Sequence, residues 1–83
     1  MYDLEQIRTV IRTTIENRGL EFTEDETSID FDSLQFISMI VELEEALNIT
    51  IDDDYLFLEH FSSFVNIENT LTDILKKQFL WNG

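Results

Sequence analysis

Few residues in this chain could take part in chemistry, and one serine, Ser33, stands out among them. It lies in the stretch SIDFDSLQF, residues 28–36, between an aspartate and a leucine, where an apolar helix is expected to begin. A serine at that place can cap the helix, or its hydroxyl can be the point at which another group is attached. The chain has no cysteine, so it offers no thiolate nucleophile and no sulfur ligands for a metal ion.

Other kinds of chemistry lack the residues that they need. Nucleophilic catalysis at Ser33 requires a base within reach, and a single histidine such as His60 is more typical of a protein surface. The aspartates within residues 30–32 and 52–54 could attract a divalent cation only loosely, because no glycine supplies the turn of an EF-hand loop. Phosphate-binding loops need glycines as well. We therefore expect neither an enzyme nor a metal-binding protein.

Charge is the strongest global property of the sequence. The chain has 18 Asp and Glu residues against five Lys and Arg, which gives a formal net charge of −13, and residues 20–74 contain no Lys or Arg. Such a surface repels nucleic acid and anionic lipid, and it steers the protein toward partners with basic patches. Acidity can also serve solubility alone, but a base-free stretch of this length favours a docking role.

Length and the first residues limit the organisation that we expect. A chain of 83 residues can bury one thin core, so residues 1–83 are predicted to form a single domain and a monomer. The start, MYDLE, has neither the basic nor the apolar part of a signal peptide, and no apolar run is long enough to span a membrane. With the absence of cysteine, these features predict a cytoplasmic protein.

The first element that could position Ser33 is a helix over residues 3–17. Apolar residues recur there at steps of three and four, and Asp3 with Gln6 forms a capping-box pattern. Arg18 followed by Gly19 is a typical helix end. Residues 20–31 show no sustained period and are predicted to form a long loop, which four apolar residues anchor: Leu20, Phe22, Ile29 and Phe31.

A second helix is predicted to begin at Asp32 or Ser33 and to run to about Leu47, with Asp32 as its N-cap. It has two apolar stripes. One should face the core and consists of Phe36, Ile40, Leu43 and Leu47. The other is rotated away from it and consists of Leu34, Ile37 and Val41. A helix that is apolar on two faces is either buried on both or presents one of them to a partner.

The last third of the chain predicts a short helix and then a main helix. Three aspartates favour a short helix over residues 53–60, and a short strand at residues 49–51 is the alternative. Ser62 or Ser63 should cap the final helix, whose apolar stripe is Phe64, Ile67, Leu71, Ile74 and Leu75. Three further apolar residues should fold back on the core or fray: Phe79, Leu80 and Trp81. The prediction is thus a small all-α bundle of three main helices and one short helix.

The surroundings of Ser33 resemble the acyl carrier and peptidyl carrier protein family. The resemblance rests on the D-S-L of residues 32–34, on the helix QFISMIVELEEALNI that follows, on the I-x-I-x-D that begins at Ile49, and on FSSFVNIENTL before the last helix. The order of the expected elements is also that of the family, and the likeness covers about residues 4–75. D-S-L alone is a weak motif, but within this frame it is a strong one.

The resemblance implies a four-helix bundle of acyl-carrier type and a carrier function without catalysis. In this interpretation Ser33 receives 4′-phosphopantetheine from coenzyme A, Asp32 caps the helix beside the attachment site, and Leu34 adjoins it. The thiol of the arm would then carry an acyl or aminoacyl group as a thioester for fatty-acid, polyketide, nonribosomal peptide or related biosynthesis. Gln35 and Ser38 occupy positions that are frequently acidic in carriers of fatty-acid synthesis, so the pathway stays open.

The same resemblance implies where partner enzymes dock. Leu34, Ile37 and Val41 match the outward apolar contacts of the family, and Glu44 and Glu45 match acids that meet basic patches. The implied partners are a phosphopantetheinyl transferase and the enzymes that load and process the acyl group, with no role for nucleic acid. The alternative, from another class, is an acidic helical adaptor or inhibitor that occupies a basic site on a partner protein.

Overall fold

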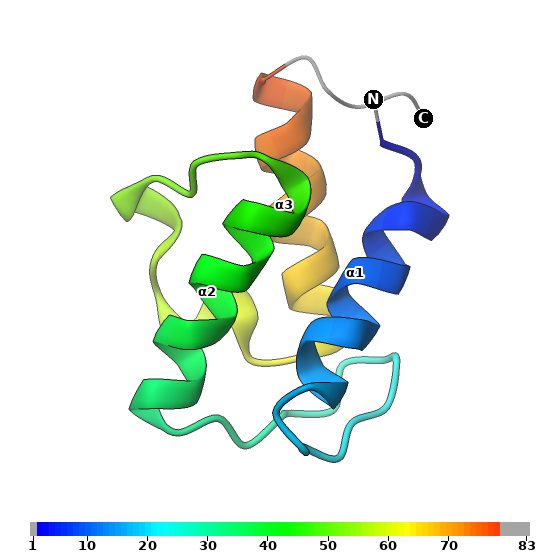
Figure 1. The fold of residues 1–83 in the computed structure, drawn as a ribbon, viewed down its shortest axis with the longest axis vertical. Coiled ribbons are helices and arrows are strands. Elements are labelled where there is room, and N and C mark those ends of the chain that lie inside the picture. The colour runs from blue at the N-terminus through cyan, green and yellow to red at the C-terminus, as the bar shows by residue number, and fades with distance from the viewer. Residues whose placement is uncertain (1, 79–83) are drawn as a thin grey trace.

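A computed structural model describes residues 2–78 as three α-helices and two 3-10 turns (Figure 1). No strand occurs within these residues, where the sheet-like pairing is one isolated bridge between Ser28 and Ser63. The predicted all-α fold is therefore confirmed. The elements are α1 (Leu4–Glu16), α2 (Ser33–Leu47), η1 (Asp53–Tyr55), η2 (Leu58–Phe61) and α3 (Phe64–Lys77).

Helix α1 begins and ends as its sequence predicts. The Asp3 carboxylate accepts a hydrogen bond from the Gln6 backbone N–H at 2.9 Å, and the Gln6 side chain accepts one from the Asp3 N–H at 2.9 Å. This reciprocal pair satisfies two N–H groups that the first helical turn leaves without partners. At the other end, Gly19 adopts a positive φ of 69°, which reverses the chain after the helix.

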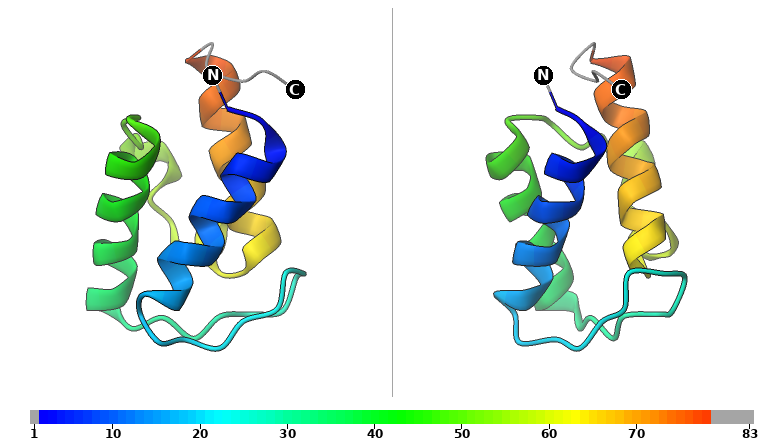
Figure 2. Two further views of the ribbon diagram at one scale, coloured as in Figure 1. Left: turned by 45° about the vertical axis from the view of Figure 1, so that its right-hand side comes forward. Right: turned by 90° about the vertical axis from the view of Figure 1, so that its right-hand side faces the viewer.

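The long loop after α1 is held against the start of α3 by backbone hydrogen bonds. The Ile29 N–H donates to the Ser62 carbonyl at 2.7 Å, and the Val65 N–H donates to the Asp25 carbonyl at 3.2 Å. The Phe22 ring stacks on Phe64, with 6.0 Å between the ring centroids. The loop therefore runs across one end of the helices and delivers the chain to the start of α2 in a fixed place (Figure 2).

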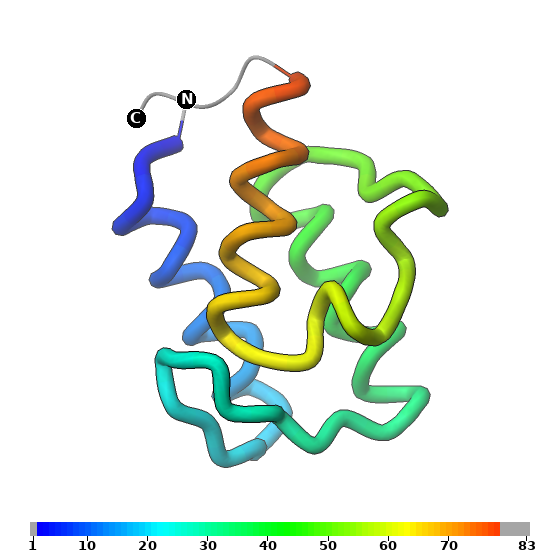
Figure 3. The backbone as a smooth tube through the Cα atoms, turned by 180° about the vertical axis from the view of Figure 1, so that it is seen from behind, coloured from blue at the N-terminus to red at the C-terminus, as the bar shows by residue number. Residues whose placement is uncertain are grey.

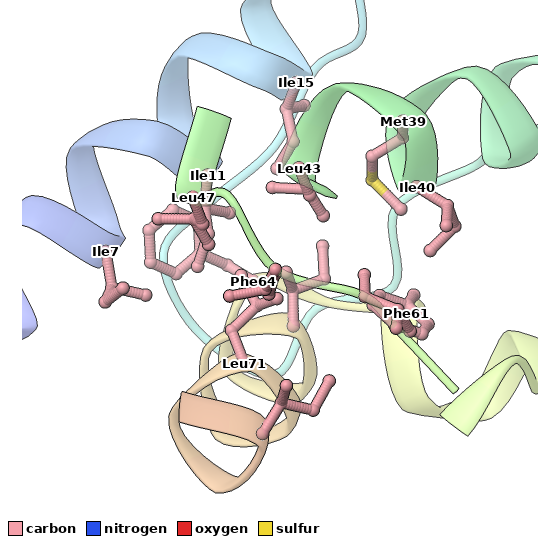
Figure 4. Packing of buried hydrophobic residues seen from close by; sticks show 14 of the residues in the cluster. Ile7, Ile11, Ile15, Met39, Ile40, Leu43, Leu47, Phe61, Phe64 and Leu71 are labelled. Atoms are coloured by element: carbon pink, nitrogen blue, oxygen red, sulfur yellow. The ribbon is translucent and has the colours of Figure 1, made fainter. Parts of the chain in front are cut away.

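The core lies between the three helices and uses the apolar stripes that the sequence defines (Figure 4). Helix α1 runs antiparallel to α2 and α3 (Figure 3), and it packs against both of them. The core face of α2 differs from the predicted stripe in two details. Met39, which is not part of that stripe, is fully buried, and Phe36, which is part of it, is only partly buried. The fully buried residues include Ile7, Ile15, Met39, Leu43, Leu47, Phe61, Ile67, Leu71 and Leu75.

The predicted short helix over residues 53–60 consists of two separate 3-10 turns, η1 and η2. The chain leaves helical geometry between them, because Phe57 is extended with φ −110° and ψ 136°. The alternative strand at residues 49–51 does not form, although Ile49 and Ile51 are both buried after α2. The expected packing of residues 79–81 lies outside the described part of the chain.

Candidate attachment site

The start of α2 is fixed by a second capping box, formed by Asp32 and Gln35. The Asp32 carboxylate accepts a hydrogen bond from the Gln35 N–H at 2.8 Å, and the Gln35 side-chain oxygen accepts one from the Asp32 N–H at 3.0 Å. The spacing D-x-x-Q is the same as in α1, so one local pattern indicates both helix starts. The sequence prediction names Asp32 as the N-cap but not Gln35 as its partner. Gln35 therefore stabilises the start of α2, at a position where carriers of fatty-acid synthesis frequently have an acidic residue.

Ser33 is the first residue of α2, and its side chain is exposed. Asp32 occupies the N–H of Gln35, whereas the N–H groups of Ser33 and Leu34 lie in the first turn and have no partner within the helix. The positive end of the helix dipole lies at the same point. Within residues 2–78 no hydrogen bond holds the Ser33 hydroxyl. These features suit an oxygen that bears a phosphate group, because helix N-termini favour anions.

A hollow of about 390 Å³ opens beside Ser33 between α2 and η2. Its walls are mainly apolar, and they come from the end of the long loop, the first turns of α2, and η2. A group attached to Ser33 would therefore leave the helix next to an apolar surface. The lining residues are Phe31, Asp32, Ser33, Phe36, Ile37 and Leu58.

The second apolar stripe of α2 faces solvent. Leu34, Ile37 and Val41 are 80%, 60% and 47% exposed, values that are unusual for three large apolar residues on one helix face. Glu45 is exposed as well. Glu44 differs, because one of its carboxylate oxygens accepts a hydrogen bond from the Ile51 N–H at 2.8 Å and so fixes the chain that leaves α2.

An ion pair that the sequence did not predict joins the turn after α1 to α2. Arg18 donates to the Glu42 carboxylate at 2.7 Å, to the Ser38 hydroxyl at 2.7 Å and to the Thr14 carbonyl at 2.8 Å. Its side chain is only 10% exposed. Burial by itself raises the pKa of Glu42, but the hydrogen bonds from Arg18 and Asn17 outweigh it and hold the pKa below its usual value. From the sequence, Arg18 is predicted only as part of a helix end, and its pairing with Glu42 is not predicted.

The other two arginines of the first segment also pair with acids of the same chain. Arg12 makes two hydrogen bonds to Glu24, at 2.7 and 2.9 Å, and Arg8 pairs with Glu68 on α3. The two pairs therefore join α1 to the long loop, through Glu24, and to α3, through Glu68.

Two further properties follow from the described residues. None of the helices in residues 2–78 is both long and apolar enough to cross a membrane. In the same part of the chain, no group of three or more His, Asp or Glu residues is placed to hold a metal ion.

The three-helix fold, the capped serine and the adjoining hollow form a small helical domain with an exposed serine at a helix start. The sequence profile of the family described as "phosphopantetheine attachment site" matches residues 5–74. The chain belongs to this family, which confirms the resemblance, and the domain is a site for covalently attached 4′-phosphopantetheine. No curated protein and no solved structure gives a significant match to the sequence.

Proposed function

We propose that Ser33 is the residue to which 4′-phosphopantetheine is attached, and that the protein carries acyl or aminoacyl groups on that arm. The observation that supports this proposal most strongly is the position of Ser33. Its exposed hydroxyl lies at the first residue of α2, beside N–H groups that can bind a phosphate and at the edge of an apolar hollow. The serine also lies inside the part of the chain that matches the family.

Attachment would proceed by transfer from coenzyme A. The Ser33 oxygen attacks the phosphorus that bears the pantetheine, a new P–O bond forms, and the pyrophosphate linkage breaks. Adenosine 3′,5′-bisphosphate leaves, and the hydroxyl proton passes to a base on the transferase, which also holds the Mg²⁺ ion. The backbone N–H groups of Ser33 and Leu34 stabilise the phosphodiester, and Asp32 keeps them in place by capping the helix.

When bound, the group supplies a thiol that holds the cargo as a thioester. This accounts for thioester chemistry in a chain without cysteine. The cargo is then presented to enzymes of fatty-acid, polyketide, nonribosomal peptide or related biosynthesis. The chain's own role is to hold the arm at a fixed helix start.

We propose that the outward face of α2 is the surface that these enzymes bind. Leu34, Ile37 and Val41 supply apolar contacts, and Glu45 supplies an exposed acid for a basic patch on the partner. Glu44 can contribute one oxygen to such a patch, because its other oxygen bonds to the backbone of Ile51.

The proposal is tested by incubating the protein with coenzyme A and a broad-specificity phosphopantetheinyl transferase, followed by intact mass analysis. Wild type should gain the mass of one phosphopantetheine, and Ser33→Ala should gain none. Ser38→Ala is the matched control, because Ser38 is also an exposed serine of α2, and it should be modified like wild type. A wild-type protein that gains nothing and still binds a basic partner would favour the adaptor function instead.

A further inference from the structure

A second exposed apolar segment lies outside α2, between η1 and η2. Leu56, Phe57 and Leu58 follow one another and are 37%, 54% and 57% exposed. In a chain with a net charge of −13, three consecutive exposed apolar residues are a marked departure from the acidic surface. Surface patches of this kind mark sites of interaction more often than chance allows.

The segment is held in place rather than hanging freely. The Tyr55 hydroxyl donates to the Asp73 carboxylate at 2.6 Å and accepts a hydrogen bond from the Lys77 ammonium, so two residues of α3 hold η1. On the other side, the His60 N–H donates to the Phe57 carbonyl at 2.9 Å, and the two rings pack edge to face. The fold therefore points Tyr55 toward α3 and leaves the residues after it facing solvent.

The exposed segment is continuous with the face of α2 that bears Ser33. Leu58 lines the same hollow as Ser33 and Ile37. The apolar surface thus runs from α2 across the hollow to η2, on the side of α2 away from α1 (Figure 1). An enzyme that reaches the Ser33 oxygen across this hollow will lie against Leu58 as well.

We propose that Leu58 and Phe57 are contact residues for the phosphopantetheinyl transferase that modifies the chain. The matching surface of the transferase is apolar opposite the hollow and basic around it, because exposed acids flank the segment on both sides: Asp53, Asp54 and Glu59. This inference rests on the proposed function of Ser33, and it extends the docking surface beyond α2.

The test is the steady-state kinetics of phosphopantetheine transfer from coenzyme A, measured as the carrier concentration is varied. Replacing Leu58 and Phe57 together with serine should raise KM for the carrier on the order of tenfold and leave kcat unchanged, because apolar contact area is lost only in the complex. The matched control is Leu4→Ser. Leu4 is also a partly exposed apolar residue, at 36%, but it lies on α1, on the other side of α2. Its KM should equal that of wild type.

The outcomes separate this inference from the proposal that Ser33 is the attachment residue. An unchanged KM in the double variant, a fall in kcat alone, or an equal rise in the Leu4→Ser control would overturn the contact role. Modification of Ser33→Ala would instead overturn the attachment site itself. Circular dichroism melts confirm that each variant folds, and the single variant Leu58→Ser takes the place of the double variant should that one unfold.

Discussion

At the first turn of α2, neighbouring residues have different tasks. Asp32 holds the helix start through Gln35, and its carboxylate is occupied by that bond. Ser33 makes no such bond within the described residues, and its hydroxyl is exposed to an approaching enzyme. Either an aspartate or a serine alone could cap this helix. The D-S pair is explained if the aspartate is the cap and the serine is the attachment point.

This division predicts different effects for two equivalent caps. Asp32→Ala and Asp3→Ala each remove the carboxylate of a capping box, so each should lower the free energy of unfolding by about 1 kcal/mol. Only Asp32→Ala should slow phosphopantetheine transfer, because only that cap orders the N–H groups beside Ser33. Urea denaturation and transfer kinetics measure the two effects. Equal transfer rates in the two variants would argue against a positioning role for Asp32.

Among the elements, α2 carries the proposed attachment and docking residues, and its place depends on contacts with α1 and with the chain that follows it. Arg18 binds Glu42 and Ser38 of α2, and Glu44 holds the backbone at Ile51. Arg18 thus fixes α2 from the side of α1, and Glu44, which continues the spacing of the exposed stripe, fixes the chain that follows α2. The three apolar residues of the stripe remain exposed beside these bonds.

Removing Arg18 should weaken this arrangement. Arg18→Ala leaves the Glu42 carboxylate, itself partly buried, without its ionic partner, and we expect a loss of about 2 kcal/mol in the free energy of unfolding. Arg12→Ala is the matched control, because Arg12 also pairs with a glutamate but in an exposed pair, and its loss should be small. Chemical denaturation of both variants checks this. If Arg12→Ala lowered the free energy of unfolding as much as Arg18→Ala, the greater contribution of the partly buried Arg18–Glu42 pair to stability would be contradicted.

The helices were predictable from the sequence, whereas the contacts between them were not. Helix starts depend on local signals, such as Asp3 with Gln6, and buried faces depend on the spacing of apolar residues. The Arg18–Glu42 pair joins residues 24 positions apart, and no local pattern indicates it. The bond from Tyr55 to Asp73, which holds η1 against α3, likewise joins residues 18 positions apart that no local pattern pairs.

The candidate site was predicted in part for the same reason. The D-S-L motif and the second stripe of α2 can be seen in the sequence, so Ser33 and the exposed face were both singled out. The hollow beside Ser33 could not be foreseen, because Leu58 reaches it from η2, 25 residues further along the chain. The exposure of the neighbouring Phe57 was not predicted either, because a regular helix was expected over residues 53–60.

The net charge of the protein should affect both its stability and its binding to partners. The net charge is −13, and the three arginines of the first segment already pair with acids of the same chain. The remaining acids repel one another in the folded state, and salt screens that repulsion. The same screening should weaken the attraction of the acidic surface for basic partners.

Thermal unfolding measured at increasing ionic strength tests this account of the charge. The Tm should rise as sodium chloride is added to a low-salt buffer, because repulsion between the acids falls within the folded state. Over the same range, KM for the carrier in phosphopantetheine transfer should increase. A Tm that does not depend on ionic strength would contradict the view that unpaired acids destabilise the fold.

Peptide mapping can identify the hydroxyl oxygen that bears the phosphopantetheine arm. The protein is purified from its own host, digested, and sequenced by tandem mass spectrometry to locate the phosphopantetheine. We expect one modified residue, Ser33, in the peptide that contains the D-S-L stretch. Phosphopantetheine on any other hydroxyl, with Ser33 unmodified, would overturn the assignment of Ser33 as the attachment residue.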